Sequence, residues 1–524
     1  MIALLLAALL AGCTGFDFKD AAEGGTPEDP AIAPGTLRID MRPASDALEL
    51  LPQSFLLAPG TYEDVQVAHE LSASSTIFGT FNAESMQGLG AAAASASGPL
   101  DAVIRAGRAG LLQGGAANTD EEGSVSFTVP GNQAYSVEII PNDASRSPMI
   151  VLGNATVDGD LDLSQTVEAG APVYGRVTDA AGVRLADTEL RLRRTDLDVS
   201  SATFTTDKNG WFIARVEPGY EYALATVGDG DAVGGPIASV EQVFTVEGAD
   251  GAEVNLDVGE RDSFVLSARA VDAGGDPIPN PHVRATSTSL ETGSLVLEFE
   301  AQSDGKITLE LLPGTWTIEV WPSTEQAELT PWVATFTVTV SDDVDDSDDI
   351  GDITLNPPTR LSGTVTRPNG EGAEGVSVTA REVGFGGYSF NTTTDADGNY
   401  TLDVPRSPLR VQAIPAIAAS GAYTNQAFDL TEADSTEAFD IPLVTGALLS
   451  GVATLNGEPV PFALVEIYDH AEELLLARTL TDADGAYTVR IDLPESEADL
   501  EGAEDSGDDT GDDTGGDTGG DTGP

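Results

Sequence analysis

The sequence has 524 residues, with 24 Lys and Arg against 87 Asp and Glu, so its formal net charge is −63 at pH 7. Such a field repels a phosphate backbone, and no basic cluster interrupts it, so the composition excludes nucleic acid as a partner. The length predicts several domains, and the 57 Gly and 30 Pro favour short strands and turns over long helices.

Residues 1–11 form an apolar run that is typical of a signal-peptide core, because a bilayer-spanning helix needs roughly 20 residues. The run ends in Leu10-Ala11-Gly12-Cys13, and this cysteine is the only one in the sequence. A disulfide within the chain is therefore excluded. Residues 13–35, rich in Gly, Pro and acidic side chains, predict a flexible tether.

The tetrapeptide that ends in Cys13 resembles the lipobox of bacterial lipoproteins. The resemblance implies that residues 1–12 are a lipoprotein signal peptide and that Cys13 carries lipid, so that membrane lipid is a partner. It also implies an extracytoplasmic address in a bacterial cell envelope, at the outer membrane or the cell surface. The alternative is an incidental cysteine in an ordinary export signal.

An internal repeat organises the rest of the chain. A turn glycine marks five copies at Gly123, Gly210, Gly305, Gly398 and Gly485, at intervals of about 90 residues. Each copy alternates apolar and polar residues, which is the period of a half-buried strand. The sequence therefore predicts an all-β protein, a tandem array of about five β-sandwich domains between disordered termini.

The second, fourth and fifth copies carry an Asp-x-x-Gly turn between two strands. The aspartate caps the turn and the glycine takes positive φ, so a structural role is sufficient to explain both residues. The residues concerned are Asp207, Gly210, Asp395, Gly398, Asp482 and Gly485.

Residues 360–405 contain a Gly-x-Val strand at 363–365, a Gly-Val-Ser-Val strand at 375–378 and Thr-Asp-Ala-Asp-Gly-Asn-Tyr at 394–400. Together these motifs resemble the carboxypeptidase regulatory-like domain, a transthyretin-like β-sandwich of the immunoglobulin-like (Ig-like) class. The resemblance extends with departures over most of 174–494. It implies a folding or interaction unit rather than a reaction.

The repeat frame predicts the domain boundaries. Residues 36–168 form a divergent sandwich region with an Ala/Gly/Ser insert at 88–98, followed by repeats at 170–258, 263–355 and 359–444, and by a truncated repeat at 447–494. The truncated repeat is either incomplete or completed by a strand from elsewhere, which would otherwise leave an exposed sheet edge. Residues 495–524 are acidic and of low complexity, and predict a disordered tail.

A second acidic run, 341–352, is predicted as a linker between two sandwiches. Clustered carboxylates at a hinge are ligands that Ca²⁺ prefers, although the spacing does not complete an EF-hand loop. The alternatives are therefore a calcium-stiffened hinge and a solvated linker, with no other cofactor expected. The acids concerned are Asp342, Asp343, Asp345, Asp346, Asp348, Asp349 and Asp352.

The sequence contains three histidines, in different copies, and after lipidation no free cysteine, so zinc chemistry has little support. Among the tryptophans, Trp211 and Trp316 stand at positions predicted to fill the cores. Trp321 and Trp332 flank a predicted loop and are the candidates for ligand binding, because aromatic faces pack on sugar rings.

The sequence favours a lipid-anchored, non-catalytic envelope protein, an acidic rod of sandwiches that acts as a surface spacer, adhesin or binding module. The competing hypothesis is a carbohydrate-binding envelope lipoprotein, because sandwiches of this class are related in fold to starch-binding domains. The expected partners are membrane lipid through Cys13 and either a polysaccharide or other envelope proteins. An enzyme is not expected.

Overall fold

The computed structural model describes residues 35–44, 50–59, 66–84, 98–108, 110–197, 199–232, 235–259, 261, 263–290, 293–323, 334–340, 347–355, 358–382, 389–405, 408–431, 438–471 and 474–492. These residues form strands joined by turns, with a short 3-10 turn, η1 (Ile417–Ala419). The predicted all-β class is confirmed.

Five units follow the repeat predicted from the turn glycines. The first, 74–167, contains β4 (Ser74–Ala83), β5 (Gly98–Pro99), β6 (Ala102–Gly107), β7 (Gly114–Asn118), β8 (Ser124–Pro130), β9 (Gln133–Pro141), β10 (Ile150–Val157), β11 (Leu161–Asp162) and β12 (Gln165–Val167). The second, 171–257, contains β13 (Ala171–Thr178), β14 (Glu189–Arg194), β15 (Val199–Ser200), β16 (Phe204–Thr205), β17 (Trp211–Val216), β18 (Glu221–Thr226), β19 (Glu241–Thr245), β20 (Ala252–Glu253) and β21 (Leu256–Asp257).

The third unit, 264–354, contains β22 (Phe264–Val271), β23 (His282–Leu290), β24 (Gly293–Glu300), β25 (Lys306–Leu311), β26 (Gly314–Trp321), β27 (Ala334–Val340) and β28 (Ser347–Thr354). The fourth, 359–442, contains β29 (Thr359–Thr366), β30 (Ser377–Glu382), β31 (Ser389–Thr393), β32 (Asn399–Val404), β33 (Leu409–Ile414), β34 (Gln426–Leu430) and β35 (Ile441–Pro442).

The fourth unit shows the plan of a repeat most simply. In one sheet its first strand, β29, pairs antiparallel with the fourth, β32, and parallel with the seventh, β35. In the other sheet the second strand, β30, pairs with the third and fifth, β31 and β33, and the fifth pairs with the sixth, β34. Alternate side chains of both sheets pack into the core between them, as the period of two requires.

The fifth unit is assembled from both ends of the chain. The C-terminal residues 447–491 contribute β36 (Ala447–Leu455), β37 (Glu458–Pro459), β38 (Leu464–Asp469), β39 (Leu474–Leu480) and β40 (Ala486–Ile491). The N-terminal residues 37–71 contribute β1 (Leu37–Arg42), β2 (Gln53–Leu57) and β3 (Gln66–Leu71), which we call the N-terminal strands.

The N-terminal strands take the fifth, sixth and seventh positions of the plan. β1 pairs antiparallel with β38, as β33 pairs with β30, and β2 pairs with β1, as β34 pairs with β33. β3 pairs parallel with β36, as β35 pairs with β29. One sandwich is thus divided between the two ends of the described chain: β36, β38, β39 and β40 take its first four positions, and the N-terminal strands take its last three.

This topology corrects two of the predicted domains. The region 36–168 is not one sandwich, because residues 37–71 belong to the fifth unit and the first unit begins at Ser74. The repeat at 447–494 lacks three strands in its own sequence, yet the sandwich is complete, so the alternative of a borrowed strand is confirmed. A pattern read within one segment does not show strands that are supplied from about 400 residues away.

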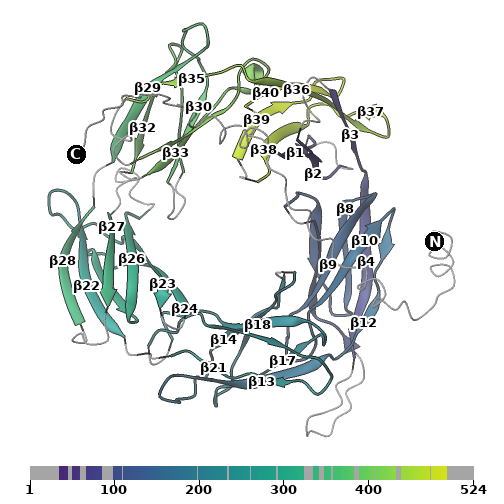
Figure 1. Ribbon diagram of the computed structural model, residues 1–524, viewed down its shortest axis with the longest axis vertical. Helices are drawn as coiled ribbons and strands as arrows, with labels where there is room; N and C mark the ends of the chain where they lie inside the picture. The colour runs from purple at the N-terminus through teal and green to yellow at the C-terminus, as the bar shows by residue number, and fades with distance from the viewer. Residues whose placement is uncertain are drawn as a thin grey trace, which may run out of the picture.

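The five units follow one another around a closed ring rather than the rod expected from a linear array (Figure 1). The sheets that contain β9, β18, β26, β33 and β38 lie towards the centre of the ring, and those that contain β4, β13, β22, β29 and β36 lie at its periphery (Figure 1). Pairing of the N-terminal strands with the last unit closes the ring.

Direct contacts join neighbouring units. Between the first and second units, the N–H of Arg215 donates to the carbonyl of Ala144 at 2.7 Å. Between the second and third, the N–H of Ser239 donates to the carbonyl of Ser294 at 2.7 Å. Between the fourth and fifth, the N–H of Arg490 donates to the carbonyl of Ser420 at 2.8 Å.

Candidate functional site

The turn aspartates hold their turns as predicted. The Asp395 carboxylate accepts the N–H groups of Asp397 and Asn399 at 3.0 and 2.8 Å, and Gly398 has a φ of 83°. These hydrogen bonds, that from Asn399 first, lower the pKa of Asp395. Asp207 and Asp482 each accept two N–H groups in the same way, beside Gly210 and Gly485, whose φ angles are 71° and 73°.

A buried threonine before each of these aspartates has a role that the sequence analysis did not recognise. The hydroxyl of Thr394 donates to the carbonyl of Ala373 at 2.6 Å and accepts the N–H of Val376 at 2.9 Å. Thr206 and Thr481 make the matching pair of bonds in the second and fifth units. The threonine of the Thr-Asp pair therefore ties the strand before the turn to the loop that enters the second strand.

The fifth unit has a polar contact inside its core at the seam between the two chain ends. His69 of β3 is 2% exposed, and its Nε2 lies 2.8 Å from the hydroxyl of Tyr487 on β40. Its ring also packs against Phe55 of β2 at a centroid distance of 4.9 Å. Burial lowers the pKa of His69 from 6.5 to about 4, so the imidazole is neutral at pH 7.

Tyr487 has a counterpart that explains its position. In the fourth unit the hydroxyl of Tyr400 donates to the carbonyl of Phe439 at 2.6 Å, just before the seventh strand. The aromatic residue after the turn glycine thus binds the seventh-strand region in both units. Gly451 leaves space for the Tyr487 ring, since a Cβ there would lie 2.5 Å from its Cε1.

The four tryptophans divide differently from the sequence expectation. Trp316 is fully buried, as predicted, and its Nε1 donates to the carbonyl of Leu312 at 2.8 Å. Trp211 was predicted to be core, and this is wrong. It lies half-buried on the outer side of β17 under the guanidinium of Arg176, and its neighbour Phe212 fills the core. A register shift of one residue exchanges the two faces of a strand.

Trp321 ends β26, half-buried, on the face of its sheet that is turned away from the core. It stands directly opposite His282 of β23, and the two rings stack at a centroid distance of 5.8 Å with an interplanar angle of 17°. The next pair along these strands is Arg284 opposite Glu319. This face therefore combines an aromatic platform with charged neighbours. Trp332 lies outside the described residues.

The acidic run is not wholly a linker. Asp348, Asp349 and Asp352 belong to β28, the seventh strand of the third unit, because this strand pairs parallel with β22. Asp352 forms an ion pair with Arg269 at 2.9 Å. Among the described residues no three acidic, His or Cys side chains converge on a possible metal position. Asp342, Asp343, Asp345 and Asp346 lie outside them.

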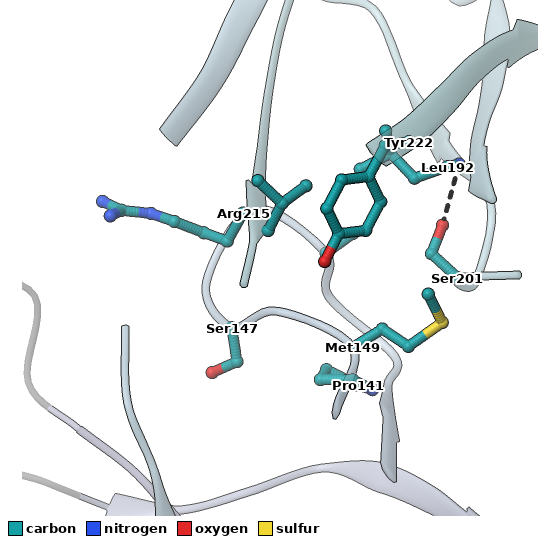
Figure 2. Close-up of a pocket in the computed structure, with 9 residues that line it drawn as sticks. Pro141, Ser147, Met149, Leu192, Ser201, Arg215 and Tyr222 are labelled. Atoms are coloured by element: carbon teal, nitrogen blue, oxygen red, sulfur yellow. Dashed lines mark hydrogen bonds between the residues drawn. The ribbon is translucent and has the colours of Figure 1, made fainter. Parts of the chain in front are cut away.

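The joint between the first two units contains a small hollow of about 10 Å³ (Figure 2). Pro141, Ser147 and Met149 face Leu192 and Tyr222 across it (Figure 2). It is smaller than the cavities of roughly 300–1,000 Å³ that take small-molecule ligands. We interpret it as a packing defect of the joint.

A larger, open hollow of about 500 Å³ lies between the same two units. It is lined by apolar side chains such as Val103 and Ile140 and by two arginines, Arg105 and Arg191. Arg105 forms an ion pair with Glu138 at 3.2 Å, so a carboxylate lies beside this arginine in the hollow. In contrast to the Trp321 face, none of its lining residues is aromatic.

Cys13 lies outside the described residues, so its lipidation stays a prediction. The part of the chain that the structure describes contains no helix long and apolar enough to cross a membrane.

Comparison with known families supports the resemblance in the fourth unit. The model of the carboxypeptidase regulatory-like domain matches residues 360–444. The fourth unit is similar to this domain. The match coincides with β29–β35 of the fourth unit and so confirms the predicted resemblance there. No curated protein matches the chain.

Solved structures that match parts of the chain include two bacterial pilins. The streptococcal ancillary pilin has 14% identity and a TM-score of 0.22, over 54% of this chain and 99% of its own. BcpA, the major pilin subunit of Bacillus cereus, has 12% identity and a TM-score of 0.16, over 53% and 99%. The Bacillus anthracis TIE protein has 10% and 0.16, over 78% and 68%. Identities and TM-scores this low support no conclusion about this chain.

Proposed function

We propose that the chain is a lipid-anchored, non-catalytic protein of the bacterial cell envelope, which acts as a surface spacer, adhesin or binding module. The observation that carries the proposal is the use of the residues that recur between units. The turn aspartates, the buried threonines and Tyr400 bind neighbouring backbone within a sandwich, and Tyr487 binds His69 of its own sandwich. These residues therefore recur because they hold the strands and turns of each sandwich together.

The anchor follows from Cys13 and the position of the N-terminal strands. The tether 13–35 directly precedes β1, so lipid on Cys13 would hold the ring through its fifth unit. A fatty-acid analogue supplied to growing cells should label the wild-type protein and not the Cys13→Ala variant. The variant should also leave the membrane fraction. Equal labelling of both proteins would refute the anchor.

A second candidate function is carbohydrate binding, which the Trp321 face favours. A half-exposed aromatic ring offers part of its apolar area to a sugar face, and polar neighbours offer hydrogen bonds to the sugar's edge. On this face the half-buried Thr317 precedes Trp321 on β26, whereas Glu319 between them is only 5% exposed. The sheet that carries them lies on the inner side of the ring (Figure 1).

A glycan and polysaccharide screen tests this candidate. The full chain should bind one class saturably, and Trp321→Ala should weaken the affinity about tenfold or more. Trp332→Ala tests the other predicted tryptophan in the same assay. Trp211→Ala is the matched control, because Trp211 is also half-buried at a strand surface but lies on an outer sheet. Equal loss in the Trp321 and Trp211 variants would contradict a site on the inner face.

A further inference from the structure

The C-terminal strands of the fifth unit accept its last three strands from the other end of the chain. Without the N-terminal strands, residues 447–491 would offer two open edges, β36 and β38, in two different sheets. Between them lies a core that includes Leu449, Val465 and Ile467, all at most 1% exposed in the closed ring. Open edges and an uncovered core together favour addition of strands.

Leu37, Ile39 and Met41 of β1 fill this core and are fully buried, and Leu71 of β3 joins them. β1 is matched to β38 over six residue pairs, and β3 to β36 over six more. The seam therefore has the form of an interface between two partners, each of which covers the apolar side chains of the other.

The fit across the seam is specific in its side chains. Arg42 of β1 forms an ion pair with Glu466 of β38 at 3.3 Å. On the other sheet, Glu70 of β3 accepts hydrogen bonds from the Thr454 hydroxyl and, at 3.2 Å, from the N–H of Gly457. With His69 against Tyr487, these contacts select the sequence of this chain's own N-terminal strands.

We propose that the fifth unit of one molecule also accepts the N-terminal strands of a second copy of this chain, so that closed rings exchange strands and join head to tail. Every hydrogen bond and apolar contact of the seam is the same whether the strands come from the same chain or from another. The two states therefore differ in ring closure and in association entropy, not in the contacts made. The proposal does not depend on the lipid anchor or on sugar binding.

The link between the N-terminal strands and the rest of the chain suits such an exchange. β3 ends at Leu71 and β4 begins at Ser74, so two residues join the fifth unit to the first. β3 and β4 follow one another along one side of the ring without turning back (Figure 1). A link this short keeps the N-terminal strands with the first unit, so the two would leave the fifth unit together.

The N-terminal strands also stay attached to the first unit of their own chain. The N–H of Leu112 donates to the Ser54 hydroxyl at 2.9 Å, and the side chain of Gln113 donates to the Ser54 carbonyl at 2.7 Å. The exchange thus separates β1 and β3 from β38 and β36, while the contacts to the first unit are kept. Closure within one chain prevails in dilute solution, and crowding of many copies favours exchange.

Cysteine cross-linking tests the proposal, since Cys13→Ser leaves the full chain without other thiols. Arg42 and Leu464 are direct cross-strand partners with their side chains on the solvent face, and opposed Cα atoms about 4.5–5.5 Å apart suit a disulfide. Chains with Arg42→Cys and chains with Leu464→Cys are mixed, unfolded, refolded together at high concentration and oxidised.

We expect a disulfide-linked heterodimer, in several-fold excess over a mixture of Arg42→Cys with Lys208→Cys, which places the second thiol in an exposed turn of the second unit. The chain carrying both Arg42→Cys and Leu464→Cys, oxidised in dilute solution, should give a cross-linked monomer. A heterodimer no more abundant than in the control mixture would overturn the exchange. Failure of the double variant to form any disulfide would overturn the seam itself.

Discussion

At the scale of single residues, the threonine that recurs before the turn aspartate is shielded from water, whereas the aspartate itself is exposed. Thr394 is 4% exposed, and its hydroxyl serves one buried donor and one buried acceptor. Recurrence of this residue therefore reflects the cost of an unsatisfied buried group. It does not indicate a reaction.

Thr394→Val keeps the shape of the side chain and removes its hydrogen bonds. We expect the fourth unit to lose about 1–3 kcal/mol of stability, because the Ala373 carbonyl and the Val376 N–H are left unpaired in the core. Hydrogen exchange of the β30 and β32 amides measures this loss. Thr393→Val, at an exposed position of β31, is the control, and an equal effect of both variants would contradict the assignment.

His69 makes the seam sensitive to acid. Its pKa is about 4 in the folded protein and 6.5 as an ordinary value, so the unfolded state binds the proton more readily between these limits. The stabilisation from neutral His69 is complete above pH 6.5 and is lost as the pH falls towards 4, with a maximum of about 3 kcal/mol.

His69→Gln removes this titration and keeps a polar group towards Tyr487. Between pH 7 and pH 4.5 the melting temperature of the wild type should fall further than that of the variant, as measured by calorimetry. The many carboxylates titrate in both proteins, so the difference between them isolates the histidine. Parallel pH profiles would contradict a buried, neutral His69.

At the scale of elements, the N-terminal strands are part of the fifth core. Ile39→Ala should destabilise the fifth unit by about 2–4 kcal/mol, because it leaves a cavity beside β38. Hydrogen exchange should speed up in β38 and β36, which lie at the other end of the sequence. Leu56→Ala is the control, because this residue of β2 is 48% exposed. If only residues near position 39 responded, the pairing would be wrong.

At the scale of the whole molecule, closure decides the shape. Replacing Ile39 with Asp buries an uncompensated carboxylate in the seam, which should separate the N-terminal strands from the last unit. The ring then opens into a longer array, and small-angle X-ray scattering should report a larger radius of gyration than for Leu56→Asp. An unchanged radius would contradict closure by these strands.

The sequence by itself determined the class of fold, the repeat and most unit boundaries, because alternation and turn chemistry are local. The turn from Asp395 to Gly398 depends on residues that are adjacent in the sequence. The sequence motif therefore predicts its role correctly. The strand and turn motifs within residues 360–405 predict a resemblance to the carboxypeptidase regulatory-like domain. The family match over residues 360–444 confirms this resemblance.

The tertiary structure decided what depends on distant pairing. Residues 37–71 alternate as strands do, but nothing within them specifies β36 and β38 as partners, so they were assigned to the wrong sandwich. Trp211 was placed in the core because a one-residue choice of register sets which face of β17 is buried. Ring closure has the same origin, since it requires side chains from both ends of the chain to fill one core.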